Sequence, residues 1–135
     1  CRVPVNASIV CNRVGFVATL ALAVYELPAP GEKLLQDAEK LCAFLRRSLR
    51  TDGSVHYTDG ATDVPAQVAP AGINEYPGLA LQALAASNRH APTEWKKDAV
   101  KRGVTHYHLR FRAHPHPLLA ATVLPAAADL YAQTK

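Results

Sequence analysis

YPGLALQALAASN, at Tyr76–Asn88, is long enough for more than three helical turns and contains no charged residue. Two further segments without charge lie on either side of it, Val14–Tyr25 (VGFVATLALAVY) and Pro117–Ala128 (PLLAATVLPAAA). The intervening segments, Glu32–Arg50 and Glu94–Arg112, carry eight charged residues each. A helix that is apolar on every side must be buried, whereas an amphipathic helix lies against a core with one face in water. The order inner, outer, inner, outer, inner predicts an all-α fold of stacked helical hairpins in two layers.

Local signals predict where these helices begin and end. The first helix is expected to start at Ser8 or Asn12, and the turn signal Thr51–Gly53 to end the second. From there to Ile73 we expect a loop that includes one short segment of β-structure. Thr93 is expected to cap the fourth helix.

The same pattern predicts which side chains are buried. In the segments without charge, we expect a core of Val17, Leu20, Ala21, Val24, Leu81, Leu84, Leu119 and Val123. The helical period predicts an inward stripe on the fourth helix at Trp95, Ala99, Gly103, Tyr107 and Phe111. Exposure is expected for Glu32, Lys40, Lys97 and Lys101.

Composition indicates one globular domain over residues 1–135, with 49% hydrophobic and 19% charged residues. The longest run without charge is well short of the roughly 20 residues that cross a bilayer, so no membrane span is expected. The net charge of +4 suggests nucleic acid as a partner. The cations share their helices with acidic residues, however, and no binding motif accompanies them, so a solvated outer face is the preferred interpretation.

The three cysteines match neither a disulfide framework nor a metal finger. Cys42 lies on the apolar stripe of the second helix and is expected in the core. A reducing, cytoplasmic setting is favoured, with a Cys1–Cys11 bridge as the alternative. The chain begins at Cys1 and stops after an inner-type helix that lacks an outer partner. We therefore expect a portion of a longer protein, with a lipoprotein beginning at Cys1 as the alternative.

A family resemblance rests on three short motifs. The loop Asp52–Ser54 (DGS), the segment Gly78–Ala85 (GLALQALA) and its lead-in Tyr76–Gly78 (YPG) resemble the α/α-toroid superfamily. That group includes terpenoid cyclases, prenyltransferases, six-hairpin glycosidases and bacterial sugar epimerases, and the similarity is closest to uncharacterised bacterial toroid proteins. The resemblance implies a partial toroid, because a complete one has more hairpins than this chain.

Connection lengths indicate which end of such a stack binds ligands. The inner-to-outer elbows are short, whereas the outer-to-inner connections include the long Thr51–Ile73 loop. In stacked hairpins the inner helices run parallel, so their N-termini and these longer loops gather at one end. Loops on a rigid scaffold commonly carry binding groups, and helix N-termini favour negative charge.

Glu75 and Tyr76 are the candidates for catalysis at that end. A carboxylate among apolar helices has a raised pKa, which suits acid–base work. The alternative is that Glu75 only stabilises the start of its helix.

Four residues are the candidates for binding a substrate: Asn12, Arg13, Tyr57 and His114. Asn12 and Arg13 could orient a carboxylate or sugar hydroxyl groups, or act only as capping and surface residues. Asp52, in an Asp-Gly turn, is expected to serve the turn.

No cofactor and no metal are expected. His106 and His108 point to different faces of a helix, and His114 with His116 would need a further ligand for zinc. Cys11 beside Arg13 is more simply a packed cysteine than an activated thiol.

Three functions are compatible with these residues. The first is a toroid segment that binds or processes a carbohydrate-like polar small molecule. The second is a non-catalytic helical-repeat scaffold or interaction module. The third is a terpenoid-cyclase-like or prenyltransferase-like protein, although the acidic cluster or zinc set of that class is absent. Whichever holds, the apolar segment Leu118–Tyr131 predicts association with the remainder of a parent polypeptide or with a second copy.

Overall fold

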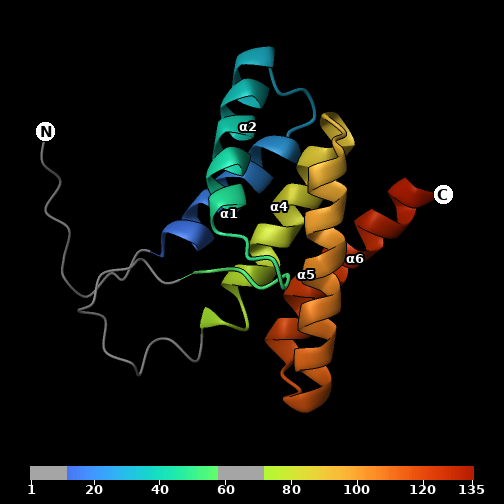
Figure 1. Cartoon of the computed structure of the whole chain (residues 1–135). Coiled ribbons are helices and arrows are strands. Elements are labelled where there is room, and N and C mark those ends of the chain that lie inside the picture. Colours follow the sequence, from blue (N-terminus) through green and yellow to red (C-terminus); the bar gives the residue numbers. More distant parts are fainter. Residues whose placement is uncertain (1–11, 58–71) are drawn as a thin grey trace, which may run out of the picture.

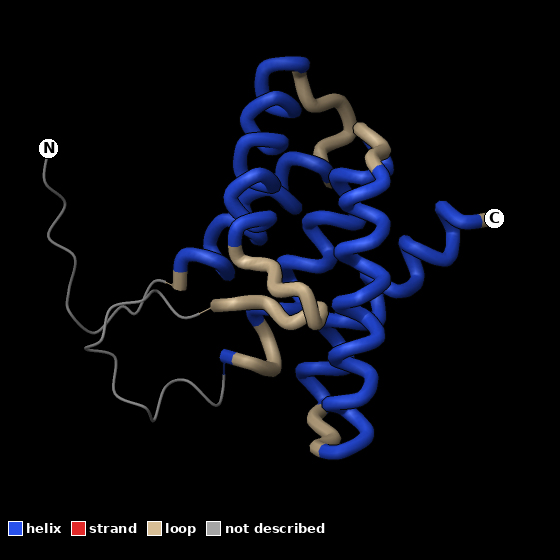
Figure 2. The backbone as a smooth tube through the Cα atoms, viewed as in Figure 1, coloured by secondary structure: helices blue, strands red, loops and turns tan. Residues whose placement is uncertain are grey.

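The computed structural model describes residues 12–57 and 72–135, which form five helices (Figure 1). Their bounds are α1 (Arg13–Tyr25), α2 (Glu32–Arg47), α4 (Tyr76–His90), α5 (Glu94–Ala113) and α6 (Pro117–Thr134). Figure 2 shows these helices joined by loops, with no strand in the part described. The prediction of an all-α protein is therefore confirmed.

The helix ends follow local hydrogen bonding. Asn12 caps α1, because its side-chain oxygen accepts a hydrogen bond from the Gly15 N–H at 2.9 Å. Thr93 occupies the N-cap position of α5, but its side chain makes no capping hydrogen bond. Instead the Asn88 side-chain oxygen accepts from the Thr93 N–H. The predicted cap residue is thus right in position, but its side chain does not form the capping bond.

Helix α2 ends at Arg47, where the chain turns back on itself. The His56 N–H donates to the Ser48 carbonyl, and Leu49 forms an isolated antiparallel bridge with Val55. Gly53 has a φ of +87°, and a Cβ there would overlap the Arg102 backbone of α5. The short β-structure expected here is therefore a single β-bridge, in a loop that packs against α5.

The helices predicted to be inner run parallel to one another. Near their starts, Gly15 of α1 lies against the Tyr76 ring of α4. Near their ends, the rings of Tyr25 and His90 stack with centroids 5.2 Å apart. Helix α4 in turn packs against α6. Gly78 faces Thr122 near the starts of these two helices, and the Asn88 amide donates to the Gln133 side chain near their ends. Because Arg13 and Glu75 begin or precede adjacent parallel helices, they lie at the same end of the molecule.

Helix α4 is more deeply buried than α1 and α6, the other two helices that contain the uncharged segments. Ten of the 15 residues of α4 are buried, among them Leu81 and Leu84. On α1, in contrast, Leu20 is 44% exposed and Phe16 59%. The prediction that Leu20 is buried is wrong, because the described helices that pack against α1, chiefly α2 and α4, leave this side chain partly uncovered.

The remaining burial predictions fall into three groups. Buried side chains include Ala21, Leu119, Val123, Ala99, Gly103 and Tyr107. Half-buried ones include Val17, Val24, Trp95 and Phe111, which were expected to face the core, and Lys97, which was expected to be exposed. Exposed ones include Glu32, Lys40 and Lys101. The inward stripe of α5 is thus confirmed at its centre and half-exposed at its ends.

Candidate functional site

Three of the predicted site residues meet at the N-terminal ends of α1 and α4. The Asn12 side-chain amide donates a hydrogen bond to the Tyr57 carbonyl oxygen at 2.5 Å. The rings of Tyr57 and Tyr76 lie 6.3 Å apart between centroids, tilted by 45°. The loop after α2 is thereby tied to the starts of two helices.

The Tyr76 ring is held by two glycines. A Cβ at Gly15 would lie 2.5 Å from Cδ1 of the ring, and one at Gly72 2.9 Å from Cδ2. Both backbones therefore approach the ring closely because neither residue has a side chain. Tyr76 packs at this end of the molecule, whatever further role its hydroxyl group has.

The other three predicted site residues are placed less closely. Glu75 is the N-cap residue of α4, is half-buried and makes no side-chain capping bond. Arg13 is exposed in the first turn of α1. His114 is exposed at the end of α5, in the α5–α6 elbow. Figure 1 places that elbow at the bottom of the view, away from the start of α1.

A cleft of about 210 Å³ lies beside Tyr57. It is lined by the loop after α2, by Ile73 and by α5: Arg50, Ser54, Val55, His56, Tyr57, Ile73, His106 and Tyr107. Its walls hold one arginine, two histidines and two tyrosines, and none of these lining residues is acidic. An Arg50 Nη2 to His56 Nδ1 distance of 3.0 Å indicates that the guanidinium donates to the imidazole.

The Tyr107 hydroxyl group anchors this cleft to α5. It accepts a hydrogen bond from the Val55 N–H at 3.0 Å. Burial raises the pKa of Tyr107 to about 12, and burial also raises the pKa of Tyr57. Both phenols therefore stay protonated near neutral pH and can serve as hydrogen-bond donors.

The turn that shapes the cleft uses Asp52 as the sequence suggested. One carboxylate oxygen accepts from the Ser54 hydroxyl group at 2.7 Å and from the Ser54 N–H at 2.9 Å. These hydrogen bonds lower the pKa of Asp52. The carboxylate is thus occupied in the turn.

At the opposite end of the inner helices is a polar cluster that the sequence did not reveal. Lys96 is 1% exposed and donates to Glu39 Oε2 at 2.8 Å and to the Ala91 carbonyl at 2.8 Å. The other carboxylate oxygen of Glu39 accepts from the Tyr25 and Ser87 hydroxyl groups. The cluster joins α1, α2, α4 and α5.

The prediction of a solvated outer face is wrong for Lys96. The other lysines of the same helix, Lys97 and Lys101, are more exposed. The available signal was its place beside Trp95 on the inward stripe. Only the position of Glu39 on the adjacent helix shows why a lysine is tolerated there.

The cluster perturbs the titration of its members. Partial burial raises the pKa of Glu39, but hydrogen bonds from Lys96, Ser87 and Tyr25 outweigh burial and lower it. Burial raises the pKa of Tyr25 and of Cys42, whose sulfur lies 3.6 Å from the Tyr25 hydroxyl oxygen. Cys42 is a buried, protonated core thiol, as its place on the α2 stripe predicted.

The parts of the chain that the structure describes contain no group of three His, Cys, Asp or Glu side chains able to hold a metal ion. None of the helices in residues 12–57 and 72–135 combines the length and apolar content needed to cross a bilayer. The proposals on Cys1 and Cys11 concern positions outside the described residues. No protein-family model matches the chain, and no curated protein or solved structure is significantly similar to it.

Proposed function

We propose that this protein binds a carbohydrate-like polar small molecule in the cleft beside Tyr57. The observation that carries the proposal is the meeting of Asn12, Tyr57 and Tyr76 at the shared end of α1 and α4, next to a cleft lined by Arg50 and two histidines. Binding groups on a loop supported by parallel helices are a common arrangement in ligand sites.

The lining of the cleft suits a ligand with several hydroxyl groups. Arg50, His56 and His106 offer N–H donors, and the Tyr57 ring offers an apolar face. The volume equals the liquid volume of about seven water molecules, which limits the ligand to a small molecule or one unit of a larger one.

The hairpin arrangement supports a toroid context for this site. Helices α1, α4 and α6 run parallel, and α2 and α5 follow the first two of them. We infer a partial α/α toroid, in which the loops at the N-terminal ends of the inner helices face the ligand. Glu75 is the proposed acid–base group if a chemical step follows binding, because it precedes α4 directly beside Tyr76.

A second candidate function is that of a helical-repeat scaffold, and apolar exposure favours it. Leu124 and Tyr131 of α6 are each 64% exposed. A largely apolar groove of about 610 Å³ also runs between α5 and α6, with Val104 and Leu130 in its lining. Surface of this kind fits the remainder of a longer polypeptide or a second copy of the chain.

Titration of the ¹⁵N-labelled protein with monosaccharides and short oligosaccharides tests the first proposal. We expect saturable amide shifts in the loop Ser54–Tyr57 and at Ile73, which are lost in Tyr57→Ala. Tyr131→Ala is the matched control, since it removes an exposed tyrosine from α6. Shifts that are absent across the panel, or equal in both variants, would contradict the proposal and leave the scaffold function preferred.

A further inference from the structure

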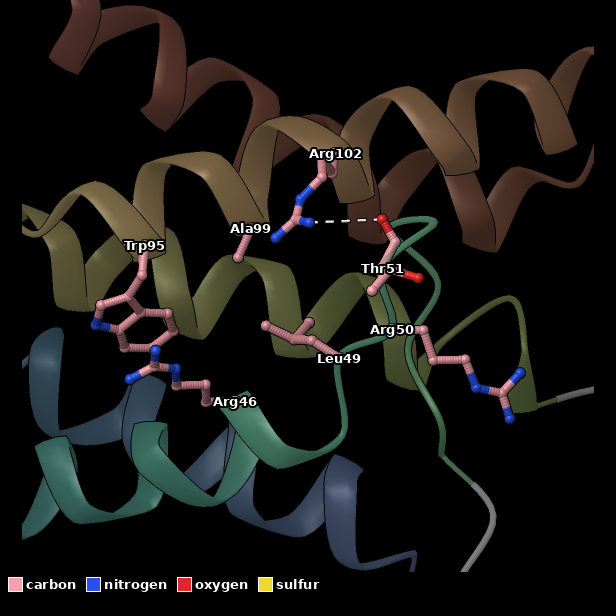
Figure 3. Close-up of a pocket in the computed structure, with 7 residues that line it drawn as sticks. All are labelled: Arg46, Leu49, Arg50, Thr51, Trp95, Ala99 and Arg102. Atoms are coloured by element: carbon pink, nitrogen blue, oxygen red, sulfur yellow. Dashed lines mark hydrogen bonds between the residues drawn. The ribbon is translucent and has the colours of Figure 1, made fainter.

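A second cleft, of about 190 Å³, lies between the C-terminal part of α2 and helix α5 (Figure 3). It is lined by Arg46, Leu49, Arg50, Thr51, Trp95, Ala99 and Arg102. Three of these residues are arginines and none is acidic. In Figure 3, Arg46 and Arg102 approach the cleft from the two different helices, whereas Arg50 points away from it.

Arg46 is positioned by an aromatic ring. Its guanidinium carbon lies 4.7 Å from the centre of the Trp95 ring, a cation–π contact. Such a contact engages the positive charge of the guanidinium, while its N–H donors can still bind an anion. The contact therefore orders the side chain without using up its hydrogen-bonding capacity.

The guanidinium group of Arg102 makes one close ion pair and one long hydrogen bond. Its Nη2 pairs with Asp98 at 3.0 Å, one helical turn away. Its Nη1 reaches the Thr51 carbonyl oxygen at 3.5 Å, which is longer than the roughly 2.7–3.2 Å of a good N–H···O bond. A ligand that offers a charged oxygen at this place would replace a weak bond with a strong one.

The floor of the cleft strengthens such an interaction. Leu49 and Ala99 give the cleft an apolar part between the two arginines. Lower local polarity increases the attraction between opposite charges. The volume corresponds to about six water molecules, which is enough for one compact anionic group.

We propose that this cleft binds the phosphate group of a small molecule, between the guanidinium groups of Arg46 and Arg102. A carboxylate has two oxygens in one plane, so a single guanidinium fork can bind both of them. A phosphate group has oxygens in several directions and up to two negative charges, which matches two guanidinium groups on different helices. This site is separate from the cleft beside Tyr57 and does not depend on what binds there.

Trp95 makes the proposal directly measurable, because it is the only tryptophan in the sequence. Sodium phosphate is titrated into the full chain while sodium chloride keeps the ionic strength constant, and glucose 6-phosphate is titrated in parallel. We expect a saturable change in Trp95 emission with phosphate. Tighter binding of glucose 6-phosphate would identify a phosphate monoester as the ligand, and equal binding would identify inorganic phosphate. A change reproduced by sodium chloride alone would overturn the proposal.

Two pairs of variants separate this site from general charge effects. Arg102→Gln should weaken phosphate binding about tenfold, whereas Arg112→Gln, an exposed position at the end of α5, should leave it within about twofold. Asp98→Asn removes the partner that competes for Arg102 and should tighten binding more than Asp37→Asn, an exposed aspartate on α2. Equal effects within both pairs would show only non-specific attraction and contradict the site.

Discussion

Lys96 Nζ lies 2.8 Å from Glu39 Oε2, although Lys96 belongs to a helix that is rich in charge and largely faces water. The lysine is 1% exposed and the glutamate side chain 35%, so the pair straddles the boundary of the core. Its hydrogen bonds reach α1, α2 and α4 from α5. It is therefore a tertiary link between helices rather than a surface ion pair.

Removal of the lysine should lower the stability of the fold. Breaking a fully buried ion pair costs about 3–5 kcal/mol, and the partial exposure of Glu39 reduces this to roughly 2–3 kcal/mol. We expect Lys96→Met to lower the free energy of unfolding by that amount in urea titrations. Lys97→Met, which removes an exposed pair with Glu94, should change it by less than about 1 kcal/mol. Similar values for the two variants would show that the cluster contributes little.

The same pair should make stability depend on pH in the acidic range. The pKa of Glu39 is lower in the folded protein than the roughly 4.3 of an unperturbed glutamate. Its contribution is thus fully present above the unfolded pKa and is lost as the pH falls through the folded pKa. We expect the free energy of unfolding to fall less steeply between about pH 5 and pH 3 in Glu39→Gln than in the wild type. Parallel pH profiles for the two proteins would contradict this assignment.

The close approach of α4 and α6 predicts a steric effect at Gly78. A Cβ at this position would overlap the Thr122 side chain and lie 2.7 Å from its carbonyl carbon, so the helices would have to separate. We expect Gly78→Ala to destabilise the protein by about 1–3 kcal/mol, measured by thermal or urea unfolding. Gly31→Ala is the control, since a methyl group there would meet no atom within 4 Å. A neutral Gly78→Ala would mean that the α4–α6 contact is looser than this packing implies.

Exposed apolar side chains on α6 predict association. We expect sedimentation velocity of the isolated chain to show concentration-dependent self-association, or the monomer to bind a hydrophobic dye. Leu124→Glu should reduce either effect, because it places a charge at a site that is 64% exposed. Leu109→Glu, at an exposed position on α5, should leave it largely unchanged. A well-behaved wild-type monomer that binds no dye would argue for a closed bundle without a partner surface.

Local sequence determined the helices themselves. The segments without charge and the charged segments each became helices, and Asn12 caps α1 at one of its two expected starts. These features depend on periodicity, capping and backbone preferences, which act within a few residues. They can therefore be recognised without knowing which helices pack together. The sequence also predicted that Arg13 and Glu75 lie at the same end of the molecule, because each connection reverses the direction of the next helix.

Tertiary structure alone decided which faces are covered and which polar groups meet. Leu20 and Leu84 lie in similar apolar segments, yet one is exposed and the other buried, because α1 has neighbours on one side and α4 is surrounded. Lys96 and Lys97 are adjacent and chemically identical, and only the place of Glu39 on another helix distinguishes them. Pairing across helices depends on how the helices pack, and a one-dimensional pattern does not contain that information.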